Sequence, residues 1–271
     1  MNTEINGDNH ITDENQEDSS KSDGGKLRRG IYLIPNLFTL AALFSGFYAM
    51  IMATKGEFSL SAIAIFVAIV LDGLDGRVAR LMHSQSEFGA QLDSLSDMVS
   101  FGIAPSLVMY IWVLHSLGHL GWCVAFIFTS CGALRLARFN THIADTVEIS
   151  TKYFIGLAIP VPAGFIASLI LTCQEFGIHG GVLPYVVAVL AVVLGLLEVS
   201  MVKYHSFKAM GTQGRVPFYF ILLAMLLIVL IAYDPPIVLL SLAVIYVLTG
   251  PIGWVWSKRN HGDILKNKTK N

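Results

Sequence analysis

Residues 72–97, DGLDGRVARLMHSQSEFGAQLDSLSD, decide the fold because they place four aspartates between two strongly apolar runs. The flanking runs, residues 58–71 and 98–114, are each too short to cross a bilayer core of about 30 Å without part of this stretch. A carboxylate inside a membrane costs roughly 2.5–3.5 kcal/mol on insertion scales. We therefore expect the aspartates to lie inside membrane-spanning helices, to face a cavity and to bind something positive. They are Asp72, Asp75, Asp93 and Asp97.

The composition predicts an all-α integral membrane protein. The chain of 271 residues is 54% hydrophobic, and its charged fraction of 14% is well below the roughly 25% of soluble domains. Its mean hydropathy is +0.64. Three cysteines without CxxC spacing argue against a disulfide framework or a zinc site.

Runs of about 20 mostly apolar residues predict eight transmembrane helices. Only the second, third and fourth of them carry charges well inside the run. The predicted spans are residues 31–53, 58–82, 88–114, 119–139, 154–174, 181–202, 216–233 and 236–256.

The distribution of basic residues predicts that both termini are cytoplasmic. With this orientation every lysine and arginine except Lys55 lies on the inner side, as the positive-inside rule requires. The outer loops are then short, which puts the active-site cavity in the cytoplasmic leaflet. We expect a disordered acidic tail (1–27) that is not a cleavable signal, one polytopic membrane domain (28–257) and a basic C-terminal tail (258–271).

Helical spacing brings the acidic side chains to one level. At 1.5 Å per residue, Asp72 lies about 21 Å from the outer end of its span, and Asp93 lies about 9 Å from the inner end of the next. Glycines at 76 and 89 allow a ligand or a neighbouring helix to approach closely. Two helical faces therefore meet at one cleft: Asp72, Asp75 and Ala79 on one helix, and Gly89, Asp93 and Asp97 on the other.

Four clustered carboxylates predict a site for two divalent cations. Hard oxygen ligands select Mg²⁺ or Mn²⁺, with Ca²⁺ as a possible occupant. Such a site suits the binding of a phosphate or pyrophosphate and an in-line displacement at phosphorus. Two other interpretations stay open here: a proton or cation relay in a cation transporter, and a polar loop between shorter helices.

The pattern Asp72-x2-Asp75-Gly76-x2-Ala79-Arg80-x8-Gly89-x3-Asp93-x3-Asp97 resembles the signature of the CDP-alcohol phosphotransferases. These membrane enzymes move a phosphoalcohol from a CDP-linked donor to an acceptor hydroxyl and release CMP. The stretches PNLFTLAALFSGFYA (35–49), DSLSDMVSFGIAPS (93–106), GALRLARFN (132–140) and FIGLAIPVPAG (154–164) resemble the phosphatidylserine synthase branch. In that branch CDP-diacylglycerol donates a phosphatidyl group to L-serine.

The resemblance implies roles for individual residues. The four aspartates would share the two cations, and Asp97 would be the general base. The donor nucleotide would lie beside Asn36, Thr39, Gly76, Ala79, Arg80 and Gly89. For Asn36 and Thr39 the alternative is a helix N-cap or an intrahelical hydrogen bond at a helix start marked by proline.

Arg135 and Arg138 are the candidate acceptor-binding residues. They stand three apart at the inner end of the fourth span, and arginine suits two-point recognition of the serine carboxylate. Alternatively, they are inner-end residues that reach toward lipid headgroups. Glycerol 3-phosphate or an inositol phosphate is the rival acceptor. The resemblance further implies a homodimer in a bacterial-type inner membrane, surrounded by lipid and without a nucleic-acid partner.

Overall fold

The computed structural model describes residues 17–82, 86–145, 153–205 and 218–268. Helices dominate it, and the first half of the chain forms α1 to α5. Their bounds are α1 (Glu17–Thr54), α2 (Phe58–Leu81), α3 (Glu87–Asp97), a π-helical segment (Met98–Ile103), α4 (Ala104–Trp112), a 3-10 turn (Leu114–Leu117) and α5 (His119–Asp145). The second half forms β1 (Tyr153–Ile155), α6 (Pro160–Glu175), α7 (Leu183–Val199), β2 (Lys203–His205), α8 (Phe218–Tyr233) and α9 (Pro235–Lys268).

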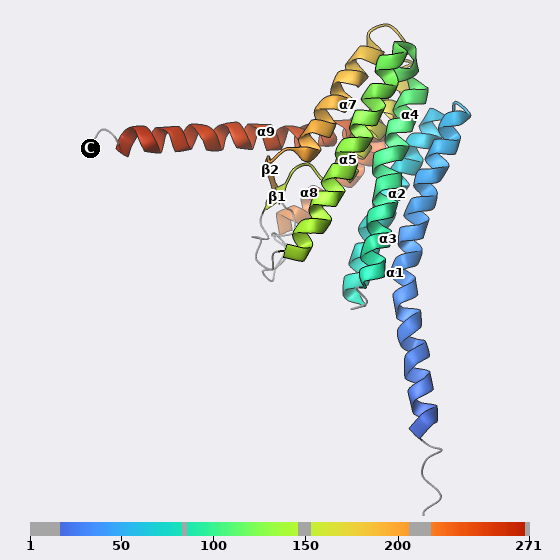
Figure 1. Cartoon of the computed structure of the whole chain (residues 1–271). Helices are drawn as coiled ribbons and strands as arrows, with labels where there is room; N and C mark the ends of the chain where they lie inside the picture. Colours follow the sequence, from blue (N-terminus) through green and yellow to red (C-terminus); the bar gives the residue numbers. More distant parts are fainter. Residues whose placement is uncertain (1–16, 83–85, 146–152, 206–217, 269–271) are drawn as a thin grey trace, which may run out of the picture.

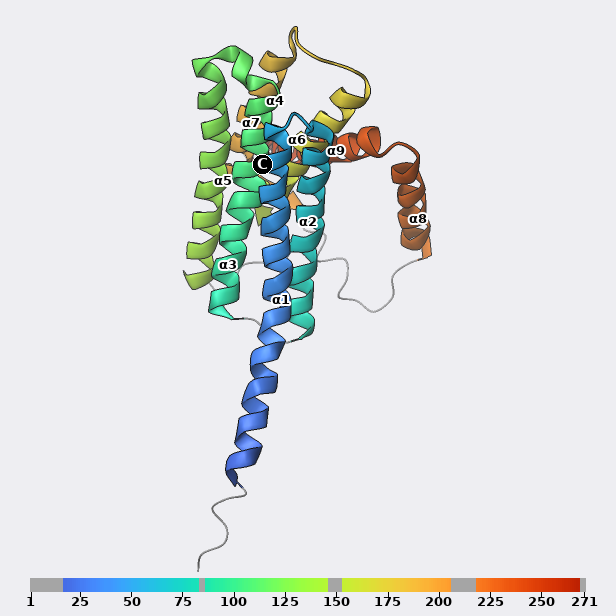
Figure 2. The same ribbon diagram turned by 90° about the vertical axis from the view of Figure 1, so that its right-hand side faces the viewer.

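The bundle of α1 to α5 with α6 and α7 forms the core. Figures 1 and 2 show α1, α2, α3–α4 and α5 running alongside one another. Large apolar side chains such as Ile65, Phe101 and Phe128 are fully buried between them. Other large apolar side chains, Phe44 and Phe126 among them, are exposed on the outside. A helix that is apolar on both its inner and its outer face suits burial in a membrane.

Five helical stretches in the described part of the chain are long and apolar enough to cross a membrane. The full count of eight spans stays a prediction. At 16 or 17 residues, α6, α7 and α8 are each only about 24–26 Å long. In Figure 1, α9 runs across the direction of the bundle, so its crossing of the same membrane is likewise a prediction. The five stretches are Ile34–Thr54, Phe58–Leu81, Glu87–Trp112, His119–Thr141 and Pro235–Gly253.

Buried serine hydroxyls fasten α1 to α2. Ser45 Oγ donates to the carbonyl of Ala64 at 2.7 Å, and Ser61 Oγ donates to the carbonyl of Ala49 at 2.7 Å. Both serines are buried. A hydroxyl in an apolar interior needs a partner, and here the neighbouring helix provides it. The two bonds therefore fix how α2, with its aspartates, lies along α1.

The same device fastens the third span to α1. Ser96 Oγ donates to the carbonyl of Thr39, and Ser100 Oγ donates to that of Ala42, each at 3.1 Å. Gly46 allows this approach, because a Cβ there would lie 2.6 Å from Ser100 Oγ. The α1 backbone thus sets the position of α3.

The third predicted span, residues 88–114, corresponds to one helical stretch, Glu87–Trp112. Within it, the π-helical segment joins α3, which ends at Asp97, to α4, which begins at Ala104. Pro105 gives the physical reason. It has no N–H to donate to the carbonyl four residues earlier. The preceding Ala104 N–H bonds to the carbonyl of Val99, five residues back, which widens the turn.

Helix α1 begins earlier than predicted. It starts at Glu17, so residues 17–27 are helical where a disordered tail was expected, and residues 1–16 lie outside the described part. Once the apolar span has formed a helix, each further residue is added at little cost, which favours extension into the polar stretch. Pro35 therefore lies inside α1. The alternative of a helix N-cap at Asn36 is wrong.

Two short strands depart from the all-α expectation. Strand β1 occupies the beginning of the predicted span 154–174, and it pairs antiparallel with β2, with Phe154 opposite Tyr204. Gly156 follows β1 with φ of 79°, a backbone conformation that favours glycine. Pro160 and Pro162 then begin α6. The glycine turn and the prolines explain why the helix starts later than predicted.

The last helix is anchored on β2. Tyr204 is buried against Gly250 of α9, its hydroxyl donates to the carbonyl of Val247 at 3.4 Å, and its ring stacks on Tyr246. Helix α9 continues to Lys268 through Pro251. Most of the predicted basic tail, residues 258–268, is therefore helical, while residues 269–271 lie outside the described part.

Candidate active site

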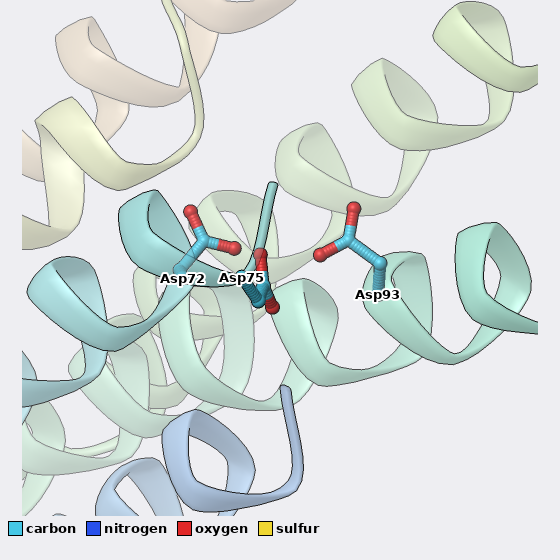
Figure 3. A group of neighbouring side chains, drawn as sticks. All are labelled: Asp72, Asp75 and Asp93. Carbon is cyan, nitrogen blue, oxygen red and sulfur yellow. The ribbon is translucent and has the colours of Figure 1, made fainter. Parts of the chain in front are cut away.

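Three of the four aspartates converge between α2 and α3. Asp72 and Asp75 lie one turn apart on α2, and Asp93 points toward them from α3 (Figure 3). Each offers a carboxylate oxygen, and these oxygens all lie within 4.8 Å of one another. Closely spaced hard oxygen ligands fit Mg²⁺, Mn²⁺ or Ca²⁺. The donor set is therefore suited to holding divalent cations.

Asp75 is held by a threonine of α1. Its Oδ2 accepts a hydrogen bond of 2.8 Å from Thr39 Oγ1, and its side chain is buried, with 5% exposed. The same Oγ1 also lies 3.2 Å from the carbonyl of Pro35. The intrahelical alternative for Thr39 is thus present, together with a direct contact to the acidic group. A partner of this kind fixes the orientation of a metal-binding carboxylate.

Asp97 lies at the end of α3, directly before the π-helical segment. Its carboxyl group is close enough to that of Asp72 to share a hydrogen bond. Its Oδ1 is buried and has no hydrogen-bond partner among the described residues. Asp97 is outside the group of three converging ligand oxygens. Among the four aspartates, Asp97 is the one with a fully buried side-chain oxygen that has no hydrogen-bond partner in the described residues.

A pocket of about 390 Å³ opens beside this acidic group. It lies between α1, α2 and α3, and Asp75 and Asp93 form part of its wall. All six residues that we expected near the donor nucleotide line it: Asn36, Thr39, Gly76, Ala79, Arg80 and Gly89.

Two glycines shape this pocket in different ways. A Cβ at Gly89 would lie 3.2 Å from Asn36 Oδ1 and 3.1 Å from Ser86 Oγ, so glycine lets α3 approach α1 here. A Cβ at Gly76 would have nothing within 4 Å and would enter open space. Arg80 is anchored at this wall, because its Nε donates to the carbonyl of Gly76 at 2.9 Å. The space over Gly76 is open to a ligand.

The two candidate arginines have different surroundings. Arg138 Nη1 donates to the carbonyl of Val199 at 3.2 Å, so it ties α5 to the end of α7. Arg135 lies within electrostatic range of Asp97 and Glu198, and its Nε is buried without a hydrogen-bond partner in the described residues. Of the pair, Arg135 is the one that interacts electrostatically with Asp97.

Glu198 is a charged residue that sequence reasoning passed over. It lies in α7 with 1% of its side chain exposed, inside the predicted span 181–202, where we expected no charge well inside the run. The signal was available, since Glu198 is the only charged residue in that span. It lies four residues from the predicted end of the span, and the packing of α5 on α7 buries it.

Comparison with known proteins gives a consistent result. A family model described as CDP-alcohol phosphatidyltransferase matches residues 32–197. The CDP-diacylglycerol–serine O-phosphatidyltransferase of Helicobacter pylori strain J99 is 35% identical over 83% of this chain and 92% of its own length. The enzyme of the same name from Methanocaldococcus jannaschii is 37% identical over 66% of this chain and 77% of its own.

A solved structure, the Mycobacterium tuberculosis phosphatidylinositol phosphate synthase with CDP-DAG bound, has a TM-score of 0.48 and 17% identity. The match covers 64% of this chain and 86% of that one.

Proposed function

The chain belongs to the CDP-alcohol phosphatidyltransferase family, and on this premise we propose that it transfers the phosphatidyl group of CDP-diacylglycerol to the hydroxyl of L-serine. The products are phosphatidylserine and CMP. Support comes from relatives that carry the name of this activity over most of the chain. Family membership and a transferase activity leave no place for the cation-transporter interpretation.

The observation that carries the proposal is the convergence of the aspartates beside the pocket of α1, α2 and α3. The pocket accepts the cytidine diphosphate of the donor, with Ala79 and the open space over Gly76 next to the nucleotide. Arg80, which lines the pocket, is available to bind the phosphates of the donor. The acyl chains then extend into the surrounding lipid, since the bundle presents apolar side chains outward.

Asp72, Asp75, Asp93 and Asp97 are the residues that would hold two divalent cations, Mg²⁺ or Mn²⁺. When bound, the cations neutralise the phosphate oxygens and stabilise the charge that develops at phosphorus. The protein contributes the orientation of the carboxylates, and Thr39 fixes that of Asp75.

The reaction we propose is a single in-line displacement. The serine hydroxyl oxygen forms a bond to the phosphatidyl phosphorus, and the bond from that phosphorus to the bridging oxygen breaks. CMP leaves with the electron pair of this bond. Asp97 accepts the hydroxyl proton, a role for which its partnerless Oδ1 is suited.

Arg135 binds the carboxylate of serine in this proposal. Its guanidinium lies within electrostatic range of Asp97, so an acceptor held there presents its hydroxyl to the base. Arg138 serves the same site less directly, because its Nη1 is bonded to the carbonyl of Val199.

We further propose that both termini and the pocket face the cytoplasm, and that the protein acts as a homodimer in a bacterial-type inner membrane. The placement of basic residues supports the orientation. Labelling of single cysteines introduced at Lys55 and at Lys26 from either side of the membrane tests it. Light scattering of the purified protein in detergent tests the dimer.

The test of the function is CMP release by purified protein with CDP-diacylglycerol and Mg²⁺ or Mn²⁺. L-Serine, glycerol 3-phosphate and inositol 1-phosphate are compared as acceptors, with a sample lacking acceptor as control. We expect release that depends on serine and yields phosphatidylserine. Release only with a phosphate-bearing acceptor would make the rival activity the correct one, and no release with any acceptor would refute the transferase assignment.

A further inference from the structure

Four buried polar side-chain atoms lack a hydrogen-bond partner in the described residues, and they belong to only three side chains. They are Asp97 Oδ1, Arg135 Nε and both carboxylate oxygens of Glu198. Buried polar groups in proteins are nearly always hydrogen-bonded. The presence of several such atoms in three residues therefore points to a ligand that supplies their missing hydrogen-bond partners.

The three residues form one electrostatic set across α3, α5 and α7. Arg135 of α5 lies within electrostatic range of both Asp97 of α3 and Glu198 of α7. It is not hydrogen-bonded to Glu198, because neither oxygen of Glu198 has a partner. Opposite charges thus face each other without direct contact.

Glycines bring α5 and α7 close together at this place. A Cβ at Gly195 would lie 3.3 Å from Cys131 Sγ, and one at Gly132 would lie 3.7 Å from Glu198 Oε2. Gly132 and Arg135 are three residues apart on α5, as Gly195 and Glu198 are on α7, so each pair shares a helix face. The close approach therefore places both charges one turn beyond the glycines.

The end of α7 that carries Glu198 is fixed from two sides. The N–H of Leu157 donates to the carbonyl of Leu197 at 3.1 Å, and Arg138 donates to that of Val199 at 3.2 Å. With the backbone held on either side of it and 1% of its side chain exposed, Glu198 cannot turn out to water. The carboxylate is thus confined to the interior of the bundle.

We infer that Glu198 binds the ammonium group of the acceptor amino acid, while Arg135 binds its carboxylate and Asp97 receives its hydroxyl proton. This inference rests on the proposed function. L-Serine carries one anionic, one cationic and one hydroxyl group, which match Arg135, Glu198 and Asp97 one to one. An acceptor with a phosphate in place of the ammonium would bring a negative charge to Glu198. The subsite therefore selects an amino acid over a phosphorylated alcohol.

The experiment compares two ligands in the variant Glu198→Gln, which keeps the shape of the side chain and removes its charge. At saturating CDP-diacylglycerol, the KM for L-serine is measured by CMP release, and 3-hydroxypropanoate, which lacks only the ammonium, is measured as a competitive inhibitor. We expect the KM for serine to rise about tenfold or more, with the inhibition constant of 3-hydroxypropanoate changed less than about twofold. Glu175→Gln, at the exposed end of α6, is the matched control.

Both constants are independent of the amount of active enzyme, so partial misfolding does not blur the result. Glu198→Asp, which keeps the charge, should retain the preference for serine and serves if Glu198→Gln does not fold. An unchanged KM for serine would overturn the inference, because Glu198 would then have no part in binding serine. Equally weakened binding of serine and 3-hydroxypropanoate would also overturn it, because Glu198 would then only support Arg135. A wild-type protein that does not use serine at all would instead contradict the proposed function.

Discussion

The two sides of the acidic group differ in how their polar atoms are satisfied. On the side of α1 and α2, the site is an open pocket in which two polar side chains already have partners: Thr39 bonds Asp75, and Arg80 bonds the carbonyl of Gly76. On the side of α5 and α7, the groups are buried, and Arg135 and Glu198 have atoms without partners.

This difference matches the two kinds of ligand that we propose. A large donor gains its binding energy from an extended pocket, so its site can be held rigid by bonds within the protein. A small acceptor offers few contacts. Its recognition depends on buried groups that stay unpaired unless the correct partner arrives, which is also how a site rejects an analogue that lacks one polar group.

The largest loss of activity is expected for the aspartates, which lie between the two sides. Asp93→Asn, like Asp72→Asn and Asp75→Asn, should reduce turnover by more than about 100-fold, because each removes a proposed ligand of the metal. Loss of even an outer-shell partner of a ligand typically costs roughly 10–100-fold in metal affinity or activity. CMP release at several Mg²⁺ concentrations measures it. Glu57→Gln, in the exposed turn before α2, should retain activity. Near-normal turnover of any aspartate variant at low Mg²⁺ would contradict the metal assignment.

A second prediction concerns the hydrogen bonds on the side of α1 and α2, where we place the CDP-diacylglycerol donor; we call this the donor side, and the side of α5 and α7 the acceptor side. Thr39→Val removes the hydroxyl that orients Asp75 while keeping the shape of the side chain. We expect the Mg²⁺ concentration for half-maximal activity to rise by about tenfold, with the KM for serine unchanged. A shift in the KM for serine alone would mean that the two sides are not separate in the way described here.

A third prediction separates the two arginines on the acceptor side. Arg135→Lys should raise the KM for serine by about tenfold, since lysine cannot make the two-point contact to a carboxylate. Arg138→Lys should change this KM less and instead lower thermal stability in detergent, because the bond to Val199 is weakened. Equal effects on the KM would place both arginines at the acceptor, as the sequence alone suggested.

The smallest effect is expected from a pair of glycines in α2. A Cβ at Gly73 or at Gly76 meets nothing within 4 Å, so alanine at either position should stabilise the helix by about 0.5–1 kcal/mol. Only Gly76 lines the pocket. Gly76→Ala should therefore weaken binding of CDP-diacylglycerol several-fold, and Gly73→Ala should not. Titration of both variants with the donor decides whether the open space over Gly76 is used.

The sequence predicts the donor side better than the acceptor side for a physical reason. Asp72, Asp75 and Asp93 lie on consecutive helices, so helical periodicity and membrane depth are enough to bring them together, and α2 ends within one residue of its predicted bound. Glu198 comes within electrostatic range of Arg135 only through the packing of α5 on α7, which no local sequence pattern specifies.

The remaining misses have the same origin. The antiparallel pairing of β1 with β2 joins residues about fifty positions apart, such as Phe154 and Tyr204. The π-helical segment depends on how the chain compensates for Pro105, which a hydropathy pattern does not reveal. The different partners of Arg135 and Arg138 likewise become visible only when the end of α7 is in place.

The serine hydroxyls that fasten α3 to α1 have one more consequence for an enzyme whose substrate is itself a serine hydroxyl. Ser96 is the immediate neighbour of Asp97, and Ser100 follows one turn later. Each donates its proton to a backbone carbonyl of α1 and is buried. A hydroxyl committed in this way cannot turn toward the base or the phosphorus. These two serines, although close to the base in sequence, are therefore unable to compete with the free amino acid as acceptors.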